Sequence, residues 1–412
     1  MNEVITGIDI GTSKICTIIS QLNKNGEIEI RGVGVSPCKG LKKGVVIDAD
    51  ETVKGIKNSV SQAEHMANIG VKTVFINIAG GHVNFIKNKG VIAVTGENKE
   101  ITKYDIERVT EAAKVIAIPA DKEIIDLIPI QYIIDGYDEI RDPLGMIGTR
   151  LEVDTNIVIA STTSVENLTR CIKKADLDVG GVIVTPLAES EVLLSKDEKE
   201  LGTCILDIGA GTTDISVFKD GAIIYSKLLP VGGDHITNDL AVGLKVSLDE
   251  AENLKRQYGF AMSDMVNEDE EIDAKSIGDQ SSFKIKAKDI CEIIEARVNE
   301  IIMLTNKNLI ESGLKSSIST GVVITGGGLS QIKGSVELTK KILNLPVRIG
   351  SPDYIGVSLP TYSAAVGIIK YVKRYKRDML SSTTEIQNNQ DGNSGFSGFF
   401  DKFKDFFSDF FQ

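Results

Sequence analysis

The sequence lacks the residues that several common kinds of functional site require. Only five of its 412 residues are cysteines, and no two are close enough for a Cys-x-x-Cys metal or redox motif; they are Cys16, Cys38, Cys171, Cys204 and Cys291. Their odd number and wide spacing argue against a disulfide framework and indicate a reducing cytosol. The three histidines are not spaced as zinc ligands either; they are His65, His82 and His235.

Long apolar runs and an excess of positive charge are also missing. No run of about 18 apolar residues occurs, so no membrane-spanning helix is expected. The N-terminal sequence MNEVITGIDIG has neither the basic nor the apolar region of a secretory signal. Because 58 acidic residues outnumber 46 basic ones, giving a net charge of −12, a broad nucleic-acid-binding role is not expected.

The segments that are present alternate between strand-like and helix-like patterns, which predicts an α/β fold. At about 100–200 residues per domain, the length predicts two to four domains. Strands are expected over Val4–Ile10, Lys14–Gln21, Glu27–Val35 and Val71–Ala79, and a helix over Asp50–Ile69.

Residues 84–162 form an apparent insertion in this pattern. Thr102 is predicted to cap a helix there, and the alternation resumes at Ser164. Strands are expected within the insertion over Ile124–Ile134 and Arg150–Ala160; in the resumed pattern, Asp176–Val184 leads into a helix over Ala188–Leu194. The charged run Lys196–Glu200 is expected to be a solvated loop.

An internal repeat marks two turns that could bind phosphate. The sequence of Ile8–Gly11 recurs in similar form at Leu206–Gly209, and each copy is followed by a short polar turn. Backbone N–H groups in such turns can donate to phosphate oxygens, because glycine allows close approach. Asp9 and Asp207 end the preceding strands and could hold Mg²⁺ through water. One such turn would suggest a plain β-hairpin, whereas two matched turns favour a phosphate cradle.

Two further segments fit the rest of a nucleotide. Gly326–Gly328 follows the strand Val322–Thr325 and could present bare peptide planes to a base, although a simple strand-to-helix turn would look the same. Ser247 and Glu250 form a predicted capping box. Glu252 and Lys255 share a helix face and could grip ribose hydroxyls and a base edge, or form only a surface ion pair.

In this order, the four elements resemble those of the actin/Hsp70/sugar-kinase ATPase superfamily. The insertion, in Ile128–Gly136 and Ile140–Glu152, closely resembles the extra subdomain of the FtsA family, the actin-like membrane adaptors of bacterial cell division. Ala251–Lys255 followed by Tyr258-Gly259 is similar to that family's ribose-and-adenine helix. The resemblance implies a two-lobed actin-like fold that holds ATP and Mg²⁺ in the cleft between its lobes.

The resemblance also implies a division of the chain and a set of binding residues. Subdomain 1A would comprise residues 1–83, 163–199 and 365–377, and subdomain 1C would comprise residues 84–162. Subdomain 2A would comprise residues 200–231 and 311–364, and subdomain 2B residues 232–310. A disordered linker, 378–394, and a membrane-targeting helix, 395–412, would follow. The implied ATP-binding residues are Asp9, Gly11, Thr12, Ser13, Lys14, Asp207, Gly209, Ala210, Gly211, Thr212, Thr213, Gly232, Gly233, Asp234, Glu252, Lys255, Gly326, Gly327, Gly328 and Leu329. Relatives place a water-orienting residue near Glu189-Ser190-Glu191, but the sequence does not single one out, so at most slow ATP hydrolysis is expected.

The C-terminal segment is unusually rich in phenylalanine. Eight of the 13 phenylalanines are Phe396, Phe399, Phe400, Phe403, Phe406, Phe407, Phe410 and Phe411. At about 100° per residue they fall within an arc of roughly 140°, which predicts an amphipathic helix lying in a membrane interface. The alternative is a helix docked on the protein's own core. The cations of Lys370–Arg377 could add a weak electrostatic attraction or only complement a helix dipole.

By the resemblance, the protein tethers FtsZ filaments to the inner face of the cell membrane at the division site, self-assembles into protofilaments and recruits later division proteins. Arg297 matches a family position that contacts the acidic C-terminal peptide of FtsZ, although an ordinary charge on a helix surface would look the same. Two alternatives have the same fold: a type IV pilus platform protein, which would not need a Phe-rich anchor, and a sugar kinase, which would need a catalytic Asp facing a sugar pocket. A chaperone ATPase would need a large domain after residue 380, where only a linker and the Phe-rich segment remain.

Overall fold

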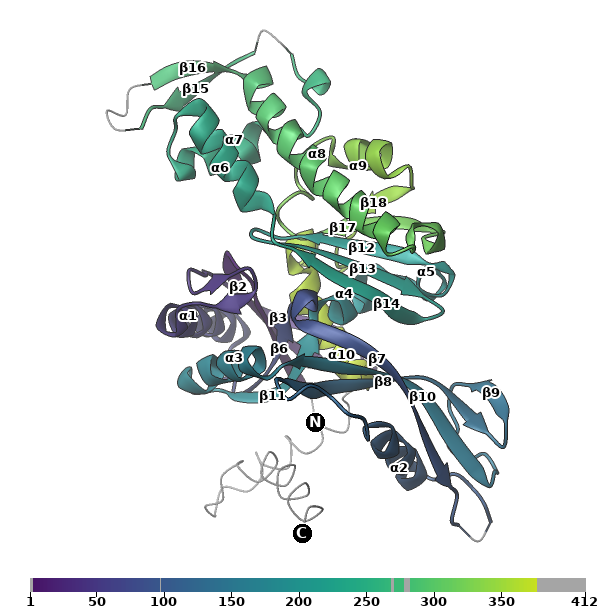
Figure 1. Ribbon diagram of the computed structural model, residues 1–412. Helices are drawn as coiled ribbons and strands as arrows, with labels where there is room; N and C mark the ends of the chain where they lie inside the picture. Colours follow the sequence, from purple (N-terminus) through teal and green to yellow (C-terminus); the bar gives the residue numbers. More distant parts are fainter. Residues whose placement is uncertain (1–2, 97, 268–269, 278–281, 376–412) are drawn as a thin grey trace.

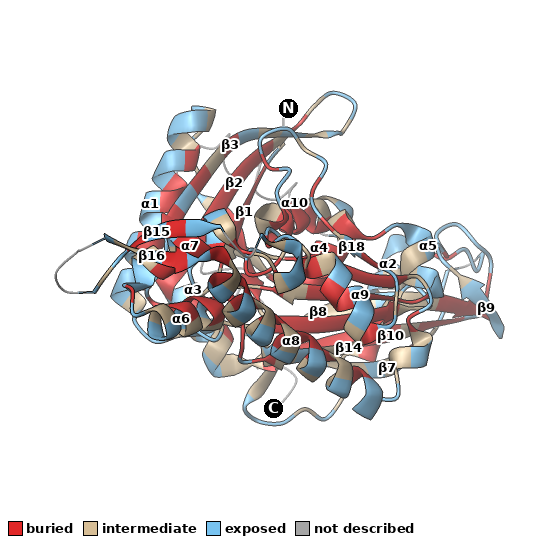
Figure 2. Ribbon diagram, turned by 90° about the horizontal axis from the view of Figure 1, so that it is seen from above, coloured by how far each residue is buried: buried red, intermediate tan, exposed pale blue. Residues whose placement is uncertain are grey.

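The computed structural model describes residues 3–96, 98–267, 270–277 and 282–375, and Figure 1 shows them arranged as two lobes. The predicted linker and the Phe-rich segment lie outside the described residues. Each lobe is built on a five-stranded sheet, with strand orders β11-β6-β1-β2-β3 and β14-β13-β12-β17-β18. In Figure 2 the buried residues follow the strands of the sheets and the inner faces of the helices that cover them.

The first sheet begins with a hairpin and continues with parallel strands. Strands β1 (Val4–Ile10), β2 (Lys14–Leu22) and β3 (Ile28–Pro37) are antiparallel, and β6 (Thr73–Ile78) and β11 (Asp178–Val184) run parallel to β1. The other elements of this lobe are β4 (Leu41–Lys42), β5 (Val45–Val46), α1 (Ala49–Ala67), the 3₁₀ helix η1 (Gly80–His82), α3 (Thr162–Lys174), α4 (Thr185–Leu193) and α10 (Ser363–Tyr375). Helices α4 and α10 pack so closely that a Cβ on Gly367 would lie 2.3 Å from the Ala188 carbonyl oxygen.

The second sheet repeats this plan. Its antiparallel strands are β12 (Thr203–Ile208), β13 (Thr213–Lys219) and β14 (Ala222–Leu229), and β17 (Gly321–Thr325) and β18 (Val347–Ile349) continue it in parallel. The α-helices of this lobe are α5 (Lys196–Leu201), α6 (Gly233–Leu244), α7 (Leu248–Tyr258), α8 (Ala287–Glu311) and α9 (Ser335–Leu343). The lobe also contains the strands β15 (Glu271–Lys275) and β16 (Ser282–Lys286) and the 3₁₀ helices η2 (Ser263–Met265), η3 (Lys315–Ser317) and η4 (Pro360–Tyr362). The sequence repeat therefore corresponds to two equivalent hairpins, β1–β2 and β12–β13.

A separate sheet extends from the first lobe (Figure 1). Its order is β7-β10-β8-β9, formed by β7 (Val83–Ala93), β8 (Lys122–Ile134), β9 (Tyr137–Ile140) and β10 (Arg150–Ser161). Helix α2 (Lys103–Ala113) packs on it around Val109 and Leu151, which have their own small core. The predicted capping box of Thr102 is confirmed, because its side chain and that of Asp105 each accept a hydrogen bond from the other's backbone.

Two local predictions, for the segment Lys196–Glu200 and for the start of α7, were wrong because of hydrogen bonds that the predictions did not include. Lys196–Glu200 is not a solvated loop but belongs to α5, which Ser195 caps through a capping box with Glu198. The capping box at Ser247 is only half formed: its side chain accepts from the Glu250 N–H, but the Glu250 carboxylate accepts from the Lys275 backbone N–H.

None of the helices within the described ranges is long and apolar enough to cross a bilayer.

Candidate functional site

The two predicted phosphate turns close in the same way and meet across the lobes. The Gly11 N–H donates to the Lys14 carbonyl at 3.0 Å, and the Gly209 N–H donates to the Thr212 carbonyl at 2.9 Å. A Cβ on Gly211 would lie 2.9 Å from the Thr12 methyl group. The turns of β1–β2 and β12–β13 therefore face each other, with the Thr12 side chain packed directly against Gly211.

The second turn also joins the start of α6 and the glycine segment after β17. The N–H groups of Gly233 and Asp234 donate to the carbonyls of Gly209 and Ala210 at 2.9 and 2.8 Å. The Gly328 N–H donates to the Ile208 carbonyl at 2.7 Å. The structure thus brings together three of the predicted nucleotide-binding segments.

The three glycines after β17 differ in what surrounds them. Gly326 has a φ of +82°, and a Cβ there would lie 2.1 Å from Asp207 Oδ1. A Cβ on Gly328 would lie 2.3 Å from the Gly209 carbonyl oxygen. A Cβ on Gly327 would approach only the Thr361 methyl group, at 3.1 Å, so this is the glycine with an open side. The side chain of Leu329, predicted at the same surface, is instead buried in the core of the second lobe.

Four carboxyl groups gather where the turns meet. Burial raises the pKa of Asp9 to about 6, opposed by the charge of Lys14 and a hydrogen bond from Asn77. Burial also raises the pKa of Asp207 to about 7, and the charge of Asp9 adds to this effect. The pKa of Asp214 rises to about 8 through burial and the charge of Asp207. Burial and these three aspartates raise the pKa of Glu189 well above its ordinary value.

This donor set fits a hard divalent cation with phosphates. Carboxylate oxygens and water are the ligands that Mg²⁺ prefers. One buried carboxyl oxygen, Asp214 Oδ1, has no hydrogen-bond partner within the part of the chain that the structure describes. Lys14 is the nearby cation; its Nζ donates to the Thr361 carbonyl at 2.7 Å and lies 5.0 Å from the centre of the Tyr362 ring. A Mg²⁺–phosphate group would compensate the crowded negative charge.

The structure separates the two glutamates that the sequence left undecided. Glu189 lies buried beside the aspartates, whereas Glu191 accepts from Lys199 at 2.6 Å and from Arg374 at 2.8 Å. Two residues apart on a helix, side chains point in nearly opposite directions, so only one glutamate can face the cluster. Asp214 and Asn77 were both missed as individual site residues. A lone asparagine in the apolar strand β6 is the signal that could have indicated Asn77.

The predicted Glu252–Lys255 pair exists but is not a surface ion pair. Lys255 is only 7% exposed. Its ammonium donates to Glu252 Oε2 at 2.6 Å, Thr237 Oγ1 at 2.7 Å and the Gly233 carbonyl at 3.1 Å. An ammonium has three protons, so these bonds use its full capacity and tie α7 to the first two turns of α6.

Arg297 lies on α8, in the second lobe. Its guanidinium makes a two-bond ion pair with Asp239 of α6 at 2.6 and 2.9 Å and also contacts Glu300. Beside it is an open hollow of about 610 Å³, lined by Ala296, Asn299, Glu300, Met303, Leu304 and Lys307. The site therefore combines a partly exposed cation with an apolar surface.

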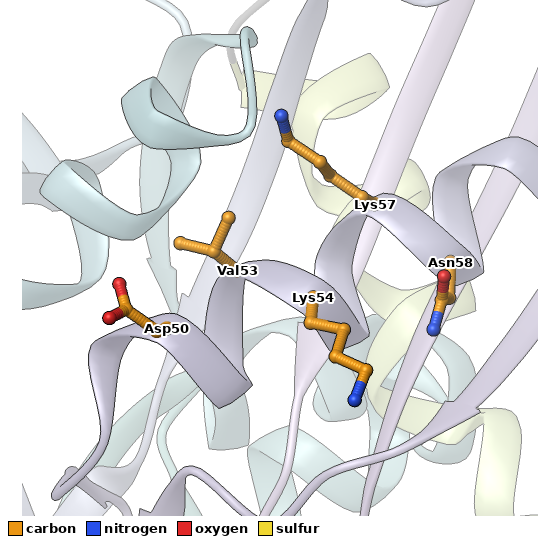
Figure 3. Close-up of a pocket in the computed structure, with 5 residues that line it drawn as sticks. All are labelled: Asp50, Val53, Lys54, Lys57 and Asn58. Carbon is orange, nitrogen blue, oxygen red and sulfur yellow. The ribbon is translucent and has the colours of Figure 1, made fainter.

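A second hollow, of about 380 Å³, lies on the surface of α1 (Figure 3). All five residues that line it come from this one helix: Asp50, Val53, Lys54, Lys57 and Asn58. Lys57 is already paired with Asp176 at 2.7 Å. The hollow contains none of the predicted nucleotide-binding residues, and we assign no function to it.

The comparisons with known proteins agree with this architecture. A family model described as "Cell division protein FtsA" matches residues 204–367, and one described as "SHS2 domain inserted in FTSA" matches residues 80–159. The cell division protein FtsA of Pseudomonas aeruginosa is 36% identical over 384 residues, covering 92% of this chain and 91% of that protein. FtsA of Bacillus subtilis is 39% identical over 376 residues, covering 91% of this chain and 85% of that protein.

Solved structures show the same fold at much lower identity. The "PilM-PilN type IV pilus biogenesis complex" gives a TM-score of 0.59 at 17% identity, covering 88% of this chain and 97% of that one. MreB5 of Spiroplasma citri bound to ADP gives 0.54 at 15% identity, covering 94% and 99%. Together with the paired hairpins, these similarities define an actin-like two-lobed fold.

The inserted sheet and the closely related sequences narrow this class. The chain belongs to the FtsA family of actin-like cell division proteins. The similarity to the pilus protein is one of fold, so it does not favour the pilus alternative.

The crowded carboxyl groups predict that the ligand-free protein loses stability as pH rises. Asp207 and Asp214 keep their protons up to a pH of about 7 and about 8 when folded, whereas a free aspartate releases its proton near 3.9. Between about pH 4 and 8 the folded state therefore binds more protons, and the free energy of unfolding should fall by up to about 1.4 kcal/mol per pH unit for each such group. Carboxyl groups with lowered pKa, such as Glu191, lose their stabilising effect only at lower pH.

Urea unfolding followed by circular dichroism at pH 5, 6.5 and 8 measures this dependence. The variant Asp214→Asn should reduce the slope, because it removes one of the groups that titrate. A free energy of unfolding that stays constant or rises over this range would contradict the assignment of a buried acidic cluster.

Proposed function

We propose that the protein binds ATP and Mg²⁺ between its lobes and uses this binding to assemble into actin-like protofilaments that tether FtsZ filaments to the cytoplasmic face of the membrane. The observation that carries the proposal is the meeting of two matched turns, a glycine segment and four carboxyl groups in a chain of the FtsA family. We further propose the subdomain division 1A, 1C, 2A and 2B set out above, and the recruitment of later division proteins.

In this proposal the turns hold phosphate through their backbone N–H groups. Asp9 and Asp207 accept hydrogen bonds from the water shell of Mg²⁺, whose charge offsets that of the carboxylates and phosphates. The open side of Gly327 receives the base, and Glu252 meets the ribose. Lys255, whose three protons are used within the protein, acts by holding Glu252 and the start of α6 in place.

Hydrolysis is expected to be slow. In this proposal Glu189 would orient a water molecule beside the phosphates, but burial among three aspartates favours its protonated form. A protonated carboxyl group is a poor acceptor for a proton from water. Nucleotide would then act chiefly as a switch for assembly.

We propose that the acidic C-terminal peptide of FtsZ docks at Arg297 and on the hollow beside it. Arg297, whose side chain is 25% exposed, would donate the N–H groups not used by Asp239 and Glu300 to a carboxylate. Met303 and Leu304 would contact apolar side chains of the peptide. Asp239 holds the guanidinium in a fixed orientation, which lowers the entropic cost of binding.

Replacing Arg297 with glutamate should weaken this docking. The change turns attraction into repulsion and should cost on the order of 1–3 kcal/mol, or roughly 5- to 150-fold in Kd. Fluorescence anisotropy with a labelled FtsZ C-terminal peptide measures the effect. Lys54→Glu, the same charge change on the exposed face of α1 in the other lobe, should leave binding unchanged. Equal affinity of wild type and Arg297→Glu would place the docking site elsewhere.

Localisation of a fluorescent fusion in dividing cells tests the proposed function as a whole. A ring at midcell that depends on FtsZ is expected. Polar foci, or an even distribution through the cytoplasm of dividing cells, would contradict the proposal.

A further inference from the structure

One buried amide lies directly behind the acidic cluster. Asn77 belongs to β6, between β1 and β11, and is 7% exposed among apolar neighbours. Burying an amide without partners costs free energy, so its hydrogen bonds show what it holds in place. Its Oδ1 accepts from the Ile10 N–H at 2.7 Å, and its Nδ2 donates to Asp9 Oδ1 at 2.7 Å.

These two bonds connect the Asn77 side chain to two neighbouring groups: the side chain of Asp9 and the backbone N–H of the next residue, Ile10. Ile10 N–H and the Asp9 carboxylate adjoin the first phosphate turn, so the amide fixes the backbone and the carboxylate together. The Asn77 Nδ2 group also lies 3.3 Å from Thr185 Oγ1. Thr185 is the first residue of α4, the helix that carries Glu189. Asn77 therefore connects the elements that carry two of the four clustered carboxyl groups.

We propose that Asn77 is a positioning residue for the Mg²⁺ site. It holds the Asp9 carboxylate in the orientation in which that group accepts hydrogen bonds from metal-bound water. In this arrangement Asn77 would act through Asp9 and would contact neither nucleotide nor metal. This inference rests on the proposed binding of ATP and Mg²⁺, and it assigns a role to a residue that the sequence pattern alone presents as part of a buried strand.

The test compares the affinity for a fluorescent ATP analogue with Mg²⁺ and with EDTA. The ratio of the two affinities measures how far the metal assists nucleotide binding. In Asn77→Leu, which has a similar volume but no hydrogen bonds, this ratio should fall about 10-fold, the lower end of the range seen when an outer-shell partner of a metal site is removed. The affinity in EDTA should change much less, because the proposed role of Asn77 acts on the metal through Asp9 and not on the nucleotide.

Two further variants separate positioning from loss of stability. Ser59→Ala removes a different buried hydrogen bond of the same lobe, to Thr17 at 2.8 Å, and should lower the melting temperature without changing the ratio. Asn77→Asp keeps the shape of the side chain and its acceptor for Ile10 but loses the donor to Asp9. It should lower the ratio as Asn77→Leu does, and it decides the matter if Asn77→Leu does not fold.

The possible failures are distinguishable. If the wild-type protein binds no ATP under either condition, the proposed function itself is wrong. If wild type shows Mg²⁺-assisted binding and the folded Asn77 variants keep its ratio within about twofold, the positioning role of Asn77 is wrong and the proposed function stands.

Discussion

Replacing Phe403 and Phe407 together with glutamate should release the protein from lipid vesicles. Both residues lie at the centre of the predicted phenylalanine arc. A phenylalanine contributes up to about 1.5–3 kcal/mol when its side chain is fully buried, and two buried charges oppose insertion of the remaining six. The expected result is a change from firm but reversible binding to nearly complete loss in co-sedimentation with liposomes.

Two controls test whether membrane binding depends on the arrangement of the phenylalanines, on the amino-acid composition of the segment or on its charge. Exchanging Phe403 with Lys404 and Phe407 with Ser408 keeps the composition but breaks the arc, and should also weaken binding. Salt should have little effect, because Phe396–Phe411 contains two lysines and three aspartates. In the basic stretch before it, Arg374 is already paired with Glu191 at 2.8 Å.

If the double-glutamate variant pellets like wild type, the anchor is not this segment. If high salt alone abolishes binding, the attraction is electrostatic and Lys370–Arg377 becomes the better candidate.

Nucleotide binding should be lost in Gly327→Trp and strongly reduced in Asp207→Ala. The indole would fill the open side of Gly327, where the base is proposed to lie. Loss of Asp207 removes a proposed partner of the Mg²⁺ water shell, and we expect binding to weaken about 10- to 100-fold in the presence of Mg²⁺. Isothermal titration with ATP and Mg²⁺ measures both effects.

Each variant has an internal control. Gly327→Ala should still bind ATP, because its Cβ would approach only the Thr361 methyl group, at 3.1 Å. Asp207→Ala relieves like-charge repulsion with Asp9, so its loss of binding should not come with a loss of stability. Unchanged affinity in folded Gly327→Trp and Asp207→Ala would show that ATP binds elsewhere.

Features set by neighbouring residues could be predicted from the sequence. The hairpin of β1 and β2, the capped start of α2 and the glycine segment after β17 depend on short patterns of apolar, capping and turn residues. The repeat of Ile8–Gly11 at Leu206–Gly209 was sufficient to place two equivalent turns, and the structure brings them together.

Features set by distant partners could not be predicted. Arg297 pairs with Asp239, 58 residues away, and Arg374 pairs with Glu191, 183 residues away. The ion pair with Arg374 holds Glu191 away from the acidic cluster, whereas Glu189 lies in it. Which of the two glutamates faces the cluster depends on the orientation of α4, which the sequence does not show. Asn77 could have been noticed as a polar residue in an apolar strand, but its bonds to Ile10 and Asp9 depend on the parallel pairing of β6 with β1.

The most direct test of the central proposal is reconstitution on a supported lipid bilayer with fluorescently labelled FtsZ. With residues 1–412 of the protein, ATP and Mg²⁺, FtsZ filaments should accumulate at the bilayer. They should remain in solution when the protein is omitted or carries Phe403→Glu and Phe407→Glu, and accumulate only weakly with Arg297→Glu. If the wild-type protein coats the bilayer and FtsZ still stays in solution, or if FtsZ accumulates equally with the double-glutamate variant, the protein is not the tether.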